Sequence, residues 1–345
     1  MFLYLYMWCL ASFASIAPVK FEKNLRYICA FFFSCILVIV IGLRFKIGGD
    51  WDAYFGMVQD ATSLEDAISR TEPAYGVLNF IANQTNLGVA FVNLICAFLF
   101  VYGLVRFSFA QPLPWLAISI AIPYLLIVVA MGYTRQSVAI GLVMLAYLSL
   151  AERKITKFIA EVIFASLFHK SAIVLLLLGL LSKDFLRSKL RFFLVAILVI
   201  PVFYVLALRI FESQWGAYVD GAMNSEGGFV RSLMNAIPAA FLILFGERFR
   251  AKWGGEYPLY RKIAFLSIAS VFLVSVAPTA VDRFSLYFIP LQIFVFSRLP
   301  LIFKGEWRVA SLIFINIFYG TVLLYWLHNS YYAKTFWLPY KSYLF

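Results

Sequence analysis

Long apolar runs separated by short polar segments dominate the chain. Most runs are about 16 to 21 residues long, which is the length that a helix needs to cross roughly 30 Å of hydrocarbon. We therefore predict an all-α polytopic membrane protein with about ten transmembrane helices. The predicted spans are Phe2–Ala17, Tyr27–Leu43, Leu87–Val105, Pro114–Met131, Gln136–Leu150, Arg191–Ile210, Ser232–Gly246, Ile263–Ala277, Phe284–Ser297 and Val309–Leu327.

One further apolar segment, Phe158–Leu181, is interrupted in its middle by His169, Lys170 and Ser171. Each half is about 11 residues long, which is too short to span a bilayer alone. The basic segments before and after it favour the same side of the membrane. We predict a re-entrant pair, or two distorted short helices, with His169 at the apex; irregular backbone at that depth must be enclosed by protein or line a watery cavity.

The composition excludes a single soluble fold. Hydrophobic residues make up 63% of the chain and charged residues 13%, with a mean hydropathy of +0.89. Soluble domains have nearer 45–50% apolar and about 25% charged residues. Because no polar stretch is long enough for a separate soluble domain and no internal repeat is visible, we expect residues 1–345 to form one integral membrane domain. Outer loops 44–86 and 211–230 are expected to cap its active site.

The charge distribution predicts the orientation of the spans. The net charge is +12, which in a soluble protein would suggest nucleic-acid binding. Here the basic residues lie in short loops between apolar runs, as the positive-inside rule requires, so no nucleic-acid partner is expected. Loops assigned to the cytoplasm hold 19 Lys/Arg and 6 Asp/Glu, whereas the outer segments hold 9 and 10. Both termini are then outside, and the first apolar run is a retained helix rather than a signal peptide.

Three arginines are predicted at or near helix N-termini on the outer side: Arg135, Arg231 and Arg283. Free backbone N–H groups and the positive end of the helix dipole favour anions there. Guanidinium groups add charge and bidentate donors, which suits a phosphate or diphosphate. The alternative is that each arginine extends to lipid headgroups, and the shared location of all three favours an anion site.

The first outer loop holds the candidate carboxylates Asp50, Asp52 and Glu72. The segment Gly48–Trp51 is typical of a tight turn that presents an acid beside an aromatic ring. A carboxylate beside a bound sugar can orient hydroxyl groups or act as a general base. The alternative is an ordinary solvated loop, because other acids lie in the same segment: Asp60, Glu65 and Asp66.

His169, flanked by Lys170, is the more informative of the two histidines. The ordinary pKa of a histidine side chain suits proton transfer or a hydrogen bond to phosphate. The alternative is that His169 is a hydrogen-bonded packing residue. The chain has no aspartate-rich metal motif, no phosphate-binding glycine loop and no serine-nucleophile signature. Neither a metal nor another cofactor is expected.

Several short motifs occur in order along almost the whole chain. Together they resemble the EpsG-like branch of the Wzy polysaccharide polymerases of bacterial inner membranes. The motifs are Leu43-Arg44 with Gly48-Gly49-Asp50-Trp51 and Tyr54, Glu72-Pro73-Ala74-Tyr75, Tyr133-Thr134-Arg135-Gln136-Ser137-Val138-Ala139, Phe168-His169-Lys170-Ser171-Ala172, Asp282-Arg283-Phe284 with Tyr287, and Leu338-Pro339-Tyr340.

The resemblance implies a GT-C-like membrane glycosyltransferase with its active site on the periplasmic face of the inner membrane. The implied donor is a growing glycan on undecaprenyl diphosphate, and the acceptor is a lipid-linked repeat unit. A hydroxyl of the acceptor would attack the donor's anomeric carbon with inversion and without a metal. Membrane lipids, a flippase and a chain-length regulator are the other implied partners.

This chemistry assigns roles to the candidate residues. The departing diphosphate needs fixed cations, for which we predict Arg135, Arg231 and Arg283, with His169 as a further donor. Asp50 is the first candidate for the base and Glu72 the second. The matched motifs add four predicted substrate-binding residues: Arg44, Lys170, Trp51 and Tyr54.

Three other functions use similar features. A flippase or secondary transporter for lipid-linked sugars would have charges along a central path and two related halves, which this chain lacks. A membrane O-acyltransferase would have a catalytic histidine within a membrane helix, and the three outer arginines argue against it. An O-antigen ligase uses the same donor, and only the family pattern favours a polymerase over it.

Overall fold

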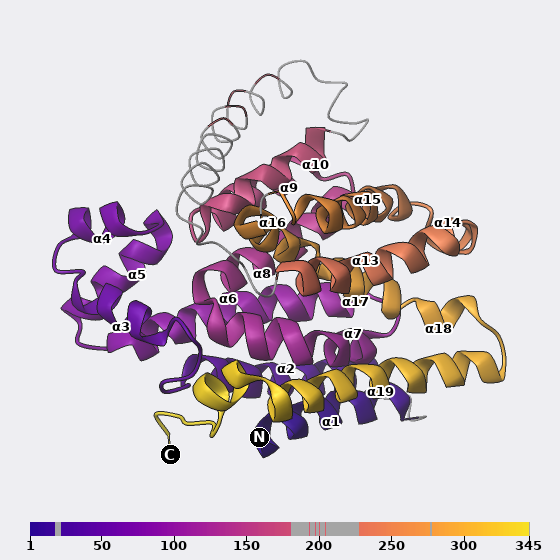
Figure 1. The fold of residues 1–345 in the computed structure, drawn as a ribbon, viewed down its shortest axis with the longest axis horizontal. Helices are drawn as coiled ribbons and strands as arrows, with labels where there is room; N and C mark the ends of the chain where they lie inside the picture. The colour runs from indigo at the N-terminus through magenta and orange to yellow at the C-terminus, as the bar shows by residue number, and fades with distance from the viewer. Residues whose placement is uncertain are drawn as a thin grey trace. The chain divides into compact units, whose positions relative to one another are not determined.

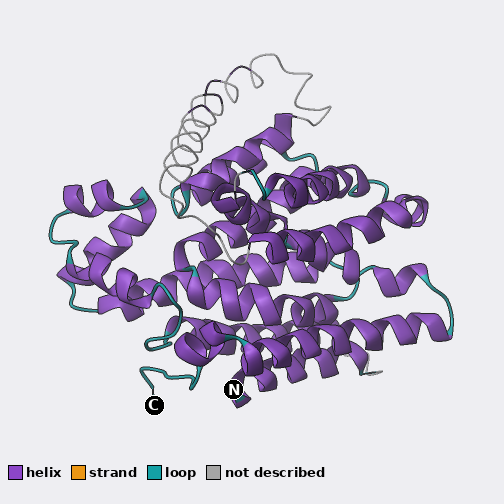
Figure 2. Cartoon of the chain, in the orientation of Figure 1, coloured by secondary structure: helices purple, strands orange, loops and turns teal. Residues whose placement is uncertain are grey.

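The computed structural model describes residues 1–17, 22–180, 228–276 and 278–344, together with positions 193, 197, 200 and 204. Within this part of the chain the secondary structure is helical and contains no strand, as Figure 2 shows. One isolated antiparallel bridge joins Arg44 to Ser342. The all-α prediction is therefore confirmed for the described residues.

Five described helices are long and apolar enough to cross a membrane: Asn24–Gly42, Gly88–Phe109, Thr134–Ala151, Val281–Ile302 and Glu306–Asn329. A sixth span results if α13 (Gly228–Leu244) and α14 (Gly246–Trp253), which meet at a bend of 78°, are counted together. Shorter apolar helices cover Phe2–Ile16, Pro114–Ala130 and Lys170–Leu180. Most of the predicted span Arg191–Ile210 and most of the predicted outer loop 211–230 lie outside the described residues. The number and length of these apolar helices indicate a multi-pass membrane protein.

The chain forms two compact units. The first unit comprises Met1–Met144, Phe164–Lys170 and Phe296–Phe345, and the second comprises Leu145–Ile163 and Ser171–Val295. In the first unit, α2 (Lys23–Gly42) packs against α6 (Gly88–Phe109), and α1 (Phe2–Ile16) packs against α7 (Pro114–Ala121). These contacts bury apolar side chains such as Leu37 and Phe100 between helices.

Small residues permit the closest helix approach in the first unit. A side chain at Gly103 of α6 would collide with the backbone of Gly141 in α8 (Thr134–Ala151). Association of helices in lipid depends on such packing because the tails around them are as apolar as leucine. Further along, α7 continues into a π-helical segment, Ile122–Ala130, which contains Pro123. Because proline has no N–H, it cannot make the regular helical hydrogen bond there.

The segment between α2 and α6 is helical rather than a simple loop. It forms α3 (Trp51–Gln59), α4 (Leu64–Arg70) and α5 (Pro73–Gln84), grouped in violet in Figure 1. Ser63 caps α4 by accepting a hydrogen bond from the Asp66 backbone N–H at 3.1 Å. Pro73 opens α5, where its fixed φ suits the first helical turn. Local capping therefore explains why a polar segment of this length is ordered.

The predicted interruption at His169 is confirmed. Helix α9 covers Ile155–Ser166, and the next helical residues are the 3₁₀ turn Lys170–Leu175 and α10 (Leu176–Leu180). His169 therefore occupies the break between two short apolar helices. Whether this pair is re-entrant in the membrane stays a prediction.

The second unit contains α13, α14, α15 (Tyr257–Leu273), α16 (Pro278–Ser285) and α17 (Pro290–Phe296). Helix α13 packs against α15 and α16. A buried polar chain connects α13 to the later helices: Asn235 donates to the Ser285 carbonyl at 2.6 Å, and Gln292 donates to Asn235 Oδ1 at 2.9 Å. Such satisfied networks fix the relative register of the helices that carry them.

Candidate functional site

The turn that carries Asp50 is built as the sequence predicts. The Trp51 backbone N–H donates to the Gly48 carbonyl at 3.2 Å, and Asp50 is the exposed residue directly before α3. Gly48 has a φ of 101°, and a side chain there would collide with the Met131 carbonyl. Only glycine is compatible with both conditions. The turn therefore fixes the backbone position from which the Asp50 side chain extends.

Arg44 is buried next to this turn and is held by hydrogen bonds. Its side chain is 1% exposed and its ring neighbour is Trp51, with the guanidinium carbon 6.0 Å from the indole centroid. A buried cation needs hydrogen-bond acceptors on all sides. Arg44 finds four: the carbonyls of Ile41 (2.6 Å) and Met131 (3.0 Å), Thr134 Oγ1 (2.6 Å) and Asn93 Oδ1 (3.3 Å).

The C-terminal tail lies against the same region. The Phe45 N–H donates to the Lys341 carbonyl and the Tyr343 N–H to the Leu43 carbonyl, both at 2.9 Å. Trp337 is buried and donates through its indole N–H to the Ile127 carbonyl at 2.9 Å. The tail therefore forms part of the structure that holds residues 43–48 in place.

An ion pair between Arg135 and Glu72 lies at the centre of the first unit's polar cluster. Arg135 Nη1 is 2.7 Å from Glu72 Oε2 and 3.0 Å from Thr71 Oγ1. The guanidinium also lies 5.9 Å from the ring centroids of Tyr54 and Tyr75. The Arg135 side chain is 28% exposed and that of Glu72 only 9%. One face of the cation is thus paired while part of it stays accessible.

The electrostatics of the cluster favour charge on Glu72. Burial opposes its ionisation, but the Arg135 guanidinium, a backbone hydrogen bond and the charge of His169 together hold the pKa of Glu72 below its ordinary value. Burial, and then the negative charge of Asp50, raise the pKa of Tyr54 to about 12 against the opposing effect of Arg135. Near neutral pH the cluster therefore contains an ionised Glu72 and a protonated Tyr54.

His169 belongs to this cluster. The segment before it is tied to the start of α5, because the Ala74 N–H donates to the Leu167 carbonyl at 3.0 Å. His169 is half-buried and lies close enough to Glu72 to affect its pKa. Lys170, the next residue, is exposed.

The other two predicted arginines lie in the second unit. Arg231, in the first turn of α13, makes a two-point ion pair with Asp282, using Nε and Nη2 toward the two carboxylate oxygens. Arg283 is exposed and lies in the last turn of α16. Arg283 was expected at or near a helix N-terminus, and it lies two residues after the start of the apolar span Val281–Ile302, although Pro278 begins α16 earlier.

The structure brings most predicted residues of the first unit together: Arg44, Asp50, Trp51, Tyr54, Glu72, Arg135 and His169. Sequence reasoning missed Thr71, Thr134 and the role of Tyr75. Tyr75 and Thr134 lie within the family motifs, close to residues with assigned roles, so their position in the sequence could have indicated a role. Nothing in the sequence around Thr71 indicated one. Metal-independence stays a prediction, although no group of three His, Cys, Asp or Glu side chains suited to a metal occurs among the described residues.

Comparison with protein families matches residues 27–342 to the EpsG family. The chain belongs to the EpsG family. The match covers every motif and every candidate residue described above, in both units. Comparison with curated proteins finds no match, and comparison with solved structures finds none either. EpsG membership, combined with the apolar helices, points to a membrane protein of polysaccharide polymerisation.

Proposed function

We propose that this EpsG-family protein is a Wzy-type polymerase that joins oligosaccharide repeat units carried on undecaprenyl diphosphate. The donor is the growing glycan and the acceptor is a second lipid-linked unit. A hydroxyl oxygen of the acceptor's terminal sugar bonds to the donor's anomeric carbon from the face opposite the leaving group. The bond from that carbon to the diphosphate oxygen breaks, and the lipid diphosphate leaves with the electron pair. The anomeric centre is therefore inverted.

The single observation that carries this proposal is the environment of Arg135. Its Nη1 is held by Glu72 and Thr71, while its Nε has no hydrogen-bond partner among the described residues. The hydroxyl of Tyr75, whose ring faces the same guanidinium, is likewise buried and without a partner in that part of the chain. Both of these atoms are buried, so the exposed 28% of the Arg135 side chain is the part that can meet the oxygens of a departing diphosphate.

The proton of the attacking hydroxyl goes to a carboxylate, and Asp50 is the better placed of the two candidates. Glu72 is buried and paired, and its lowered pKa makes it a weaker base. Asp50 is exposed on a rigid turn. We assign proton acceptance to Asp50. Glu72 then acts as a positioning residue that orients Arg135, and His169 acts as a further donor to phosphate oxygen.

The remaining predicted residues take lesser parts in the proposal. Trp51 and Tyr54 were predicted to bind substrate, but both are buried, with their rings near the guanidinium groups of Arg44 and Arg135. They therefore act through these arginines, whereas Lys170 is an exposed cation. Arg44 acts through the turn, because protein oxygens already surround its guanidinium. The assignment of Arg231 and Arg283 to the diphosphate rests on their predicted places near helix N-termini and, for Arg283, on the Asp282-Arg283-Phe284 motif.

The membrane setting is also part of the proposal. The full chain would make about ten crossings in a GT-C-like arrangement, with the described cluster on the periplasmic face of a bacterial inner membrane. The lipid-linked donor and acceptor would reach that face through a flippase, and a chain-length regulator would set the product size. No residue described above is assigned to either partner.

Polymer formation in vitro tests the proposal. Purified full-length protein receives an authentic undecaprenyl-diphosphate-linked repeat unit in EDTA, and products are separated by gel. We expect a ladder of lengths that disappears in Arg135→Ala and His169→Ala. A single transfer to a different acceptor would identify a ligase. Movement of the substrate across a bilayer without any new glycosidic bond would identify a transporter.

A further inference from the structure

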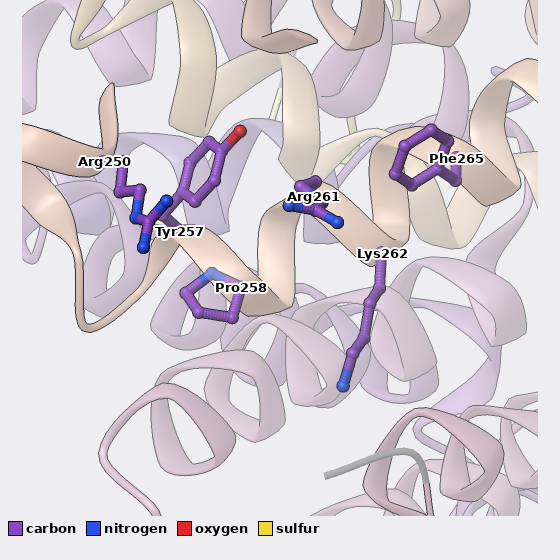
Figure 3. A pocket seen from close by; sticks show the side chains of 6 residues that line it. All are labelled: Arg250, Tyr257, Pro258, Arg261, Lys262 and Phe265. Carbon is purple, nitrogen blue, oxygen red and sulfur yellow. The ribbon is translucent and has the colours of Figure 1, made fainter. Parts of the chain in front are cut away.

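A second polar site lies in the second unit, and none of the residues used above lines it. A cavity of about 480 Å³ is lined by Arg250 of α14 and by residues of the first half of α15: Tyr257, Pro258, Arg261, Lys262 and Phe265. Figure 3 shows these side chains gathered around it. Its volume is within the range of small-molecule pockets and exceeds that of a single phosphate ion.

The lining is strongly cationic. Arg250, Arg261 and Lys262 contribute three positive charges, and no lining residue is acidic. The cavity is also at the N-terminal end of α15, where the helix dipole adds positive potential. Two acids lie nearby in the chain, Glu247 in α14 and Glu256 directly before α15, and the three lining cations outnumber them. The charge of the cavity therefore selects an anion.

The same cavity has an apolar side. Phe265 is 53% exposed, and its ring lies 5.8 Å from the guanidinium carbon of Arg261. Beyond Lys262 the helix becomes apolar from Ile263 onward, as a segment entering a bilayer does. Cations and an apolar ring that line one cavity match an amphiphile with a phosphate head and a hydrocarbon tail. A free phosphate ion would use only the cationic half.

We propose that this cavity binds the phosphate group of an anionic phospholipid at the membrane surface. Arg250 and Arg261 hold the phosphate oxygens, since guanidinium groups match phosphate geometry. Lys262 adds a third charge, and Phe265 contacts the start of the acyl chains. The site is independent of the polymerase chemistry, because none of its residues belongs to the Arg135 cluster.

The test measures binding directly on the full-length protein in neutral detergent. The probes are dioctanoyl phosphatidylglycerol, dioctanoyl phosphatidylcholine and inorganic phosphate, and bound molecules are counted by native mass spectrometry. We expect saturable binding of phosphatidylglycerol, with phosphatidylcholine and inorganic phosphate at least about tenfold weaker. Arg250→Gln and Arg261→Gln should each weaken phosphatidylglycerol binding about fivefold, the value of roughly one surface charge.

Arg248→Gln is the matched control, because Arg248 is on the same helix as Arg250 and exposed but does not line the cavity. An equal loss in this control would show general charge attraction and overturn the site. Inorganic phosphate binding as tightly as the lipid would overturn the lipid assignment. Arg261→Lys keeps the charge but not the planar guanidinium, so its affinity should lie between those of the wild type and Arg261→Gln. Such a graded loss would not result from misfolding.

Discussion

Two ion pairs, one in each unit, join an arginine at the start of a helix to an acid far away in the sequence. Arg135 meets Glu72 through one oxygen and shares its remaining surface with Thr71 and two tyrosine rings. Arg231 meets Asp282 through two nitrogens and two oxygens. The Arg231 and Asp282 side chains are about equally exposed, at 20% and 19%, whereas Arg135 is three times as exposed as Glu72, at 28% against 9%.

The difference shows how an arginine–carboxylate pair can either stabilise the packing of helices or leave the arginine available to a ligand. A two-point pair satisfies both partners, so it contributes mainly to helix packing. A one-point pair whose cation keeps 28% of its side chain exposed leaves that part able to meet a further anion. Position at a helix N-terminus, which both arginines share, does not separate these roles.

Replacing Arg135 should have the largest effect. Arg135→Ala removes the proposed diphosphate donor and leaves buried Glu72 unpaired, so polymer formation should fall about 10³-fold. Arg231→Ala should cost about tenfold, because two of its donors already serve Asp282. Initial rates at equal amounts of folded protein measure both. Equal losses would remove the functional contrast between the two pairs.

Replacing Asp50 should have the next largest effect. Asp50→Asn keeps the turn and its hydrogen bond but removes proton acceptance, so the rate should fall about 10²-fold. Asp52→Asn is the control, because Asp52 is also exposed and lies two residues away in α3. A folded Asp50→Asn variant that polymerises at the normal rate would show that Asp50 is not the base.

Exchanging the charges of each pair separates stability from activity. Asp282→Ala should lower the free energy of unfolding by about 2 kcal/mol, between the values for exposed and buried pairs. Arg231→Asp combined with Asp282→Arg should recover most of that loss in thermal unfolding. Arg135→Glu combined with Glu72→Arg should recover part of the stability but no activity. The guanidinium would then be attached at position 72, directly before α5, instead of at position 135. Recovered polymerisation in this second double variant would contradict the assigned role of Arg135.

The pH dependence of stability should show the smallest effect. The pKa of Glu72 is lowered in the folded protein, so its ionised form stabilises the fold above its ordinary pKa of 4.5. That contribution is lost as the pH falls through the lowered pKa. Glu72→Gln should therefore unfold at a lower temperature than wild type at pH 6, and the gap should narrow below about pH 4.5. Glu65→Gln replaces an exposed carboxylate outside the ion pair, and narrowing of equal size in this control would contradict the assignment to Glu72.

Features that depend on neighbouring residues were predictable. The Gly48–Trp51 turn, the helix start beside Arg135 and the break at His169 all depend on a few adjacent side chains, and the structure has each of them. The segment after the turn was expected to be a loop because it is polar. It is helical instead, since Ser63 and Pro73 supply helix starts within it.

The sequence by itself determined that this is a multi-pass membrane protein of the EpsG family, helical throughout its described residues, because apolar run length and motif order are properties of the chain alone. Only the tertiary structure decided which acid pairs with which arginine, that Arg44 is buried, and that the tail braces residues 43–48. These contacts join residues 50 to 300 positions apart. Hydropathy requires that the helices bury their apolar faces, but several arrangements of the helices meet this requirement equally well. Which polar side chains pair is therefore decided only when the helices assemble.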